Sequence, residues 1–163
     1  MLGSPAGVIL HWVAPRGRTS NRRRLVVSAQ NEAAVRHCFE NASQGNFDVL
    51  DQSISPDYVL HPEEVRGIDG LTEMVQAYRS AFADLRVTID HQFAEGDYVA
   101  TRTTITGRHE GDLMGVPPTG REVAFNGLTI SRCRGGKIEE EWELVDTVTL
   151  LRQVGALPGT PEA

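Results

Sequence analysis

The sequence predicts an α+β fold, in which N-terminal helices pack on one face of a curved antiparallel sheet. In the first half of the chain, apolar residues recur at the spacing of a buried helix face, at Val35, Cys38, Phe39 and Ala42. In the second half, apolar and polar residues alternate from Leu85 to Phe93, as in a half-buried strand. Helices followed by hairpin-linked strands are typical of a helix-covered sheet. A curved sheet closed in this way encloses a cone, with one pocket at its open end.

Two helices, a short helical segment and a short strand are predicted in the first half. Asn31 is the expected N-cap of the first helix, and Gly45 ends it. Residues 47–54 form the short helical segment, and residues 58–61 form the short strand. Asp69 is the expected cap of the second helix, whose apolar face comprises Leu71, Met74, Val75, Tyr78 and Phe82.

Four longer strands are predicted in the second half. Glu95-Gly96-Asp97 and Gly135-Gly136 are hairpin turns, whereas a loop rich in glycine and proline covers residues 111–120. Residues 147–155 have room for one or two helical turns. The predicted strands are residues 85–93, 98–109, 121–134 and 138–145.

One domain is predicted over residues 29–157, between a disordered tail of residues 1–28 and a short C-terminal tail of residues 158–163. The apolar run at 7–14 lacks the preceding basic residues of a secretory signal, and the apolar stretch after Arg22-Arg23-Arg24 ends almost at once. We therefore expect residues 1–28 to be dispensable for folding and the protein to be cytoplasmic. The two cysteines are isolated thiols, which make neither a disulfide framework nor a zinc site.

The distribution of charge bears on the partners of the protein. The chain has 163 residues and a formal net charge of -6. The arginines at positions 16, 18 and 22–24 all precede the first acidic residue, Glu32, so the rest of the chain is strongly acidic and would repel nucleic acid. No apolar run approaches the roughly 20 residues of a membrane helix. We expect neither nucleic acid nor a membrane as a partner, and we expect a homodimer or higher homo-oligomer.

The second half also carries a family pattern. It consists of Thr106-Gly107-Arg108-His109-Glu110-Gly111, the run from Met114 to Arg121 (Met-Gly-Val-Pro-Pro-Thr-Gly-Arg), Gly136-Lys137-Ile138, the pair Trp142 and Asp146, and Leu151-Arg152-Gln153-Val154-Gly155. Over residues 31–157 this pattern resembles the SnoaL-like polyketide cyclases (ester cyclases). They belong to the nuclear-transport-factor-2-like superfamily, which also holds ketosteroid isomerases and limonene-epoxide hydrolases. The resemblance implies the cone fold of that superfamily.

The resemblance also implies an activity. The best-known relatives close a polyketide ring by intramolecular aldol condensation, with an aspartate near the end of the last strand as acid/base. By position this aspartate is Asp146, and His109 is the candidate for an assisting histidine. The epoxide-hydrolase triad of two aspartates and an arginine is incomplete, because Thr104 and Leu144 accompany Arg102. This departure argues against epoxide hydrolysis.

The residue types indicate how an enolate would be stabilised. A lysine Schiff base, a divalent metal or hydrogen bonds in a dry pocket can each do so. The only lysine, Lys137, lies in a predicted turn, and neither His-x-x-x-His nor paired-cysteine spacing occurs. We therefore predict no cofactor and no metal, with hydrogen bonds from an apolar pocket. The absence of Gly-x-Ser-x-Gly argues against a serine hydrolase.

Each catalytic candidate has an alternative interpretation. Asp146 follows Leu144-Val145 and lies four residues after Trp142, so a continued strand would place both on one face. Apolar neighbours would then raise the pKa of Asp146 and make it a better base. The alternative is a helix N-cap for the residues from Thr147 onward. His109 ends a strand at the glycine-rich loop, where it lines a pocket mouth or is simply an exposed loop residue.

Five further residues are predicted to bind the substrate: Arg102, Trp142, His61, Asn126 and Glu140. Strand alternation places Glu140 beside Trp142 in the pocket and leaves Glu139, Glu141 and Glu143 on a solvated face. Tyr58, Tyr78 and Tyr98 are each able to donate a hydrogen bond to the enolate, and the sequence does not rank them.

Two classes of function remain at this point. One is an enzyme that acts on an apolar carbonyl compound, by cyclisation or by isomerisation of the ketosteroid-isomerase kind. The other is a non-catalytic module that binds a small ligand or drives dimerisation. An inward acid with an inward histidine or arginine favours the enzyme, and a wholly apolar pocket favours the binding module.

Overall fold

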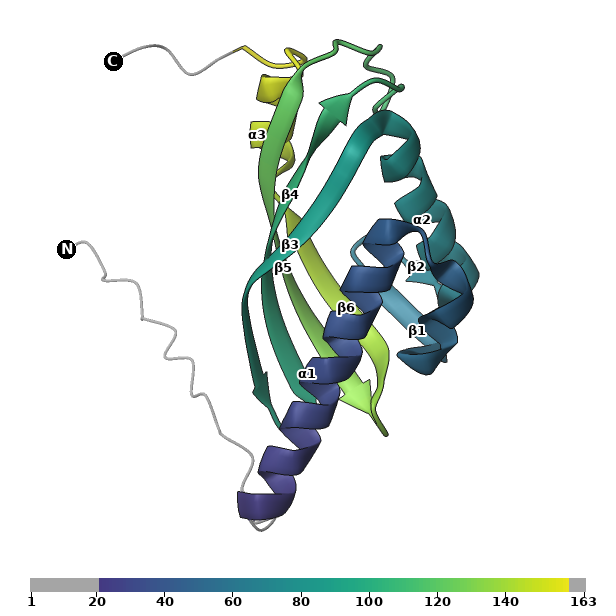
Figure 1. Ribbon diagram of the computed structural model, residues 1–163, viewed down its shortest axis with the longest axis vertical. Coiled ribbons are helices and arrows are strands. Elements are labelled where there is room, and N and C mark those ends of the chain that lie inside the picture. Colours follow the sequence, from purple (N-terminus) through teal and green to yellow (C-terminus); the bar gives the residue numbers. More distant parts are fainter. Residues whose placement is uncertain (1–20, 159–163) are drawn as a thin grey trace, which may run out of the picture.

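The protein is described here by a computed structural model that covers residues 21–158 (Figure 1). The expectations for residues 1–20 and 159–163 lie outside the described residues. Among the helices of residues 21–158, none combines the length and apolarity needed to cross a membrane. In chain order the elements are α1 (Asn21–Gln44), η1 (Phe47–Gln52), β1 (Ile54–His61), β2 (Val65–Arg66), α2 (Gly67–Ala81), β3 (Phe82–Glu95), β4 (Tyr98–His109), β5 (Glu122–Arg134), β6 (Lys137–Val145) and α3 (Thr147–Gln153).

The strands form one sheet in the order β2-β1-β6-β5-β4-β3. Figure 1 shows the long strands curving together, with α1 crossing the sheet and α2 beside it. The predicted α+β fold of helices on a curved sheet is therefore confirmed. One pair departs from the antiparallel prediction, because β1 runs parallel to β6. This pairing places β6 in the interior of the sheet, between β1 and β5.

Two clusters of buried apolar side chains hold the helices on the sheet. The first includes Val35, Leu50 and Ile54, and the second includes Phe82 and Phe125. Burial of apolar side chains of this size contributes about 1.5–3 kcal/mol each to folding. The space between these clusters becomes the site described below, because residues packed on either cluster line it.

The first helix begins earlier than predicted. Asn31 lies inside α1 rather than at its start, and residues 21–28, assigned above to the tail, are helical. Two side chains of α1 explain this by binding the β3–β4 turn. Asn31 Nδ2 donates to the Gly96 carbonyl at 2.9 Å, and Ser28 Oγ accepts from the Gly96 N–H at 3.0 Å. A long-range contact has thus replaced the local capping role that asparagine favours.

The second helix also differs at its ends. It begins at Gly67, so Asp69 lies in its first turn and is not its cap. Phe82, predicted on the apolar face of this helix, is the first residue of β3.

Alternation along β3 changes phase part of the way along. Leu85, Val87 and Ile89 are half-buried, as predicted, but the pairing with β4 shifts between Ile89 and His91. A shift of one residue moves every later side chain to the other face. Phe93 is therefore 72% exposed, and the prediction that it faces the core was wrong.

Candidate active site

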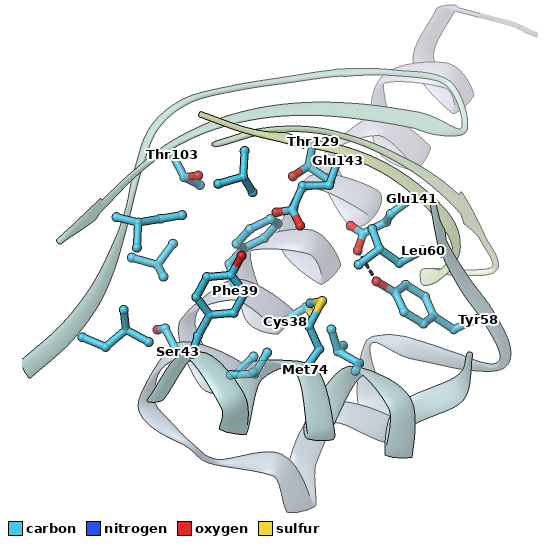
Figure 2. A pocket seen from close by; sticks show the side chains of 18 residues that line it. Cys38, Phe39, Ser43, Tyr58, Leu60, Met74, Thr103, Thr129, Glu141 and Glu143 are labelled. Atoms are coloured by element: carbon cyan, nitrogen blue, oxygen red, sulfur yellow. Dashed lines mark hydrogen bonds between the residues drawn. The ribbon is translucent and has the colours of Figure 1, made fainter. Parts of the chain in front are cut away.

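A cavity of about 110 Å³ lies between the helices and the inner face of the sheet (Figure 2). Its wall is mainly apolar, with Phe39 from α1, Leu71 and Met74 from α2, and Leu85 and Val87 from β3. Carboxyl and hydroxyl groups reach it from the sheet, namely Glu141, Glu143, Thr129, Thr103 and Tyr58. The site therefore combines a dry wall with a few polar groups, as small-molecule sites do.

The two carboxyl groups come from successive inward positions of β6. Glu141 is 5% exposed and Glu143 is partly buried, whereas Trp142 and Leu144 on the other face are 40% and 72% exposed. Figure 2 shows Glu141 and Glu143 projecting toward the side chains that line the cavity. The prediction for this strand, with Glu140 and Trp142 in the pocket and Glu141 and Glu143 in solvent, was wrong.

A register shift in β6 explains the error. Ile138 is fully buried, and counting in twos from it would place Glu140 and Trp142 inside. The pairing of β5 with β6 shifts between Arg132 and Cys133, which leaves Glu139 as an extra residue in β6. Val145 lines the cavity, and every second residue counted back from it, Glu143 and then Glu141, also points inward.

Glu141 is held by two hydroxyl groups. Tyr58 Oη donates to its Oε2 at 2.7 Å, and Ser131 Oγ donates to its Oε1 at 2.5 Å. Burial raises the pKa of Glu141, and these two hydrogen bonds offset part of the rise. The pKa of Tyr58 is raised as well, first by burial and then by the charge of Glu141.

The environment of Glu143 allows its carboxyl group to exchange a proton near neutral pH. Its pKa is raised from 4.5 to about 7, by burial first and then by the carboxylates of Glu141 and Glu63. Thr129, the cross-strand partner of Glu143 on β5, offsets part of this rise. The Thr129 hydroxyl is buried beside this carboxyl and close enough to stabilise its charge, but it has no well-formed hydrogen bond to a described residue. A ligand can therefore compete for it.

Asp146 occupies its alternative position, the N-cap of α3. Its Oδ1 accepts from the Thr149 N–H at 3.0 Å, and its side chain is exposed. The hydrogen bonds with Thr149 lower the pKa of Asp146, so the predicted rise was wrong. The strand ends at Val145, and Trp142 itself faces outward, so the spacing from Trp142 does not direct Asp146 into the cavity.

His109 is a core residue rather than a pocket or loop residue. It is fully buried, its ring lies 5.7 Å from that of Phe82, and its Nδ1 is 3.0 Å from Thr119 Oγ1. Its Nε2 has no hydrogen-bond partner among the described residues, and the ring does not line the cavity. The prediction of a catalytic position for His109 was therefore wrong.

The five predicted substrate-binding residues gather on the outer face of the sheet. Arg102 Nη1 lies 2.5 Å from Asp90 Oδ2, and Arg102 Nη2 donates to Asn126 Oδ1 at 3.0 Å. Glu140 lies 3.0 Å from His61 Nε2 and 2.7 Å from Arg132 Nη2. The Trp142 ring stacks on His61 at 5.7 Å. None of the five lines the cavity between the helices and the sheet. Arg102 and Asn126 instead line, together with Asp146, a separate hollow of about 320 Å³ on the outer face.

A second hollow, of about 440 Å³, adjoins the cavity. The two share Met74, Tyr78, Glu143 and Val145, so Glu143 faces both. Glu63 and Asp112 line the outer hollow. A ligand that fills the inner cavity has room to extend past Glu143 into the outer hollow.

Comparison with known proteins agrees with this architecture. Residues 32–154 match the family of SnoaL-like polyketide cyclases. The nogalonic acid methyl ester cyclase of Streptomyces nogalater is 30% identical over 117 residues, which are 68% of this chain and 87% of that protein. Aklanonic acid methyl ester cyclase DauD of Streptomyces sp. (strain C5) is 28% identical over 134 residues, which are 78% of this chain and 83% of that protein.

Solved structures show the same likeness. TsrD from Streptomyces laurentii is 30% identical with a TM-score of 0.73, covering 79% of this chain and 97% of its own. IdmH from Streptomyces antibioticus is 34% identical with a TM-score of 0.68, covering 77% of this chain and 99% of its own. The helix-covered curved sheet is the fold that these solved structures share. More specifically, the chain belongs to the SnoaL-like polyketide cyclase family, which confirms the predicted resemblance and the prediction of a cyclase.

Proposed function

We propose that this protein closes a ring in a neutral, largely apolar polyketide ester by intramolecular aldol condensation, with Glu143 as the acid/base. The observation that supports the proposal best is a partly buried carboxyl group, with a pKa of about 7, between two hollows that a ligand can fill. A general base works best when its pKa lies near the working pH. The names of the similar cyclases supply the substrate class, because both are methyl ester cyclases.

The residues support each step of such a reaction. Ionised Glu143 takes a proton from the carbon next to one carbonyl, and the resulting enolate carbon forms a bond to a second carbonyl carbon. The oxygen of that carbonyl becomes an alkoxide and takes the proton back from Glu143. Once Glu143 holds the proton, the Thr129 hydroxyl beside it can donate to the developing oxyanion. The reaction needs no redox partner. Lys137 lies away from the cavity, where its Nζ donates a hydrogen bond to the Asp51 carbonyl at 2.7 Å.

The charges around the site support a neutral substrate. Among the described residues that line the two hollows, the charged side chains are carboxylates, with Glu63 and Asp112 beside Glu143 in the outer one. They would repel a substrate carboxylate, whereas an ester has no charge to repel. An ester is therefore the better ligand.

An assay with aklanonic acid methyl ester and its free acid tests this proposal. We expect ring closure of the ester and at least about tenfold lower kcat/KM for the acid, because like-charge repulsion in a pocket costs on the order of 1.4 kcal/mol or more. Equal turnover of acid and ester would contradict the assignment of substrate class. Absence of ring closure with any polyketide ester of this size would contradict the proposed activity.

We also propose that the protein is a cytoplasmic homodimer formed through the outer face of the sheet. Two cross-strand pairs, Leu128 with Leu144 and Ile130 with Trp142, make a continuous exposed apolar patch there. Patches of this kind mark association surfaces. Ile130→Glu is expected to give a monomer by light scattering, whereas Leu25→Glu, at an exposed leucine of α1, leaves the assembly unchanged. The free thiols of Cys38 and Cys133 suit a reducing compartment.

A further inference from the structure

The proposed acid/base has a second carboxyl group beside it that no step of the aldol reaction uses. Glu141 lies two residues before Glu143 on the same face of β6, is 5% exposed, and also lines the cavity. A buried carboxyl group without a cation is costly to a fold. Neither Arg, Lys nor His occurs among the described residues that line the cavity.

We propose that Glu141 is a positioning residue. It stays ionised because two hydroxyl groups donate to it, and its negative charge keeps on Glu143 the one proton that the two carboxyl groups share. The proposal rests on the acid/base role of Glu143 proposed above. Glu141 would touch neither the substrate nor the reacting atoms. Its negative charge would set the pH at which Glu143 gives and takes its proton.

The hydrogen bonds favour this distribution of the proton. Both oxygens of Glu141 accept from hydroxyl groups, Oε2 from Tyr58 at 2.7 Å and Oε1 from Ser131 at 2.5 Å. An ionised carboxylate only accepts, so two donors stabilise its charged form. Glu143 has a single hydroxyl neighbour of this kind, that of Thr129, which forms no well-formed hydrogen bond. Figure 2 shows the hydrogen bond that joins Tyr58 to Glu141, and Glu143 beside Thr129.

Other titratable groups surround Glu143, and they do not cancel the charge of Glu141. Tyr78 from α2, Glu63 from the β1–β2 connection and Asp112 from the loop after β4 line the outer hollow with Glu143. Tyr58 from β1 and Cys38 from α1 lie on the Glu141 side, and the pKa of each is raised by burial first and then by the Glu141 charge. All of these groups are neutral or negative near neutral pH. The charge of Glu141 raises the pKa of Glu143 more than the charge of Glu63 does.

A titration without substrate tests the proposal independently of any assay. Carbon-13 NMR of glutamate carboxyl groups gives the midpoint for Glu143, assigned by the signal that Glu143→Gln removes. In Glu141→Gln we expect this midpoint to fall by about one pH unit or more, because a like charge has been removed. Glu140→Gln is the matched control, since Glu140 is the adjacent residue on the outer face, and it should leave the midpoint unchanged.

Tyr58→Phe keeps the test decisive if Glu141→Gln fails to fold. It removes one donor to Glu141 and leaves the ring in place, so Glu141 should hold a proton more strongly and Glu143 should ionise at lower pH. A folded variant of either kind with an unchanged Glu143 midpoint would overturn the proposal. That result would leave the acid/base role of Glu143 standing, because that role fails only if Glu143→Gln keeps its turnover.

Discussion

The two faces of β6 carry similar residues and have opposite chemistry. On the outer face, Glu140 pairs with Arg132 and lies 3.0 Å from His61 Nε2, and exposed Trp142 stacks on His61. On the inner face, Glu141 and Glu143 have hydroxyl neighbours and no cation among the cavity-lining residues. The outer glutamate pairs with an arginine, whereas burial raises the pKa of both inner glutamates. Burial and partners, rather than residue type, decide which glutamate of this strand can exchange a proton near pH 7.

Apart from the loss of the acid/base itself, the largest effect that would sharpen this comparison is expected at Thr129. Thr129→Val keeps the shape of the side chain and removes its unpartnered hydroxyl. Loss of a donor to an oxyanion typically costs about 10²–10³ in kcat. Because the hydroxyl makes no well-formed hydrogen bond with a described residue, the thermal midpoint should change little. Calorimetry and turnover of one preparation check both; unchanged turnover would remove Thr129 from the mechanism.

The free energy of unfolding is expected to depend on pH through Glu143, on the inner face of β6. The pKa of Glu143 is raised from 4.5 to about 7, so the folded state favours its protonated form. That contribution is complete below pH 4.5 and is lost as pH rises through about 7. It amounts to at most about 3 kcal/mol in the free energy of unfolding. Urea titrations of the wild type and Glu143→Gln give the free energy of unfolding at each pH, and the difference between the two pH profiles is the contribution of Glu143. Parallel profiles from pH 4 to 8 would contradict a raised pKa.

The smallest effect is expected at Asp146. Asparagine caps helices nearly as well as aspartate, and the Asp146 side chain lies outside the cavity. Asp146→Asn should therefore keep turnover within about twofold and change the free energy of unfolding by less than about 0.5 kcal/mol. A loss of turnover by a factor of about 10² in a folded Asp146→Asn protein would return this residue to the mechanism.

Residue patterns predicted the elements far better than the faces of the strands. The order of helices and strands, and the bounds of β4, follow from local periodicity and turn residues. Which side chains of a strand point toward the core could not be predicted where the strand changes register. This happens in β3 between Ile89 and His91 and in β6 at Glu139. One extra residue exchanges the inner and outer sets, and no local residue preference marks it. The early start of α1 was missed for a related reason, because Ser28 and Asn31 bind a turn more than 60 residues away.

The central claim is that Glu143 transfers the proton in ring closure, and one comparison tests it most directly. Turnover of aklanonic acid methyl ester is measured for the wild type, Glu143→Gln and Glu140→Gln, with circular dichroism to verify folding. Loss of a general acid/base lowers turnover by about 10²–10⁴. Glu143→Gln should show that loss, whereas Glu140→Gln, which breaks only outer-face ion pairs, should stay close to the wild type. Wild-type turnover in folded Glu143→Gln would contradict the account.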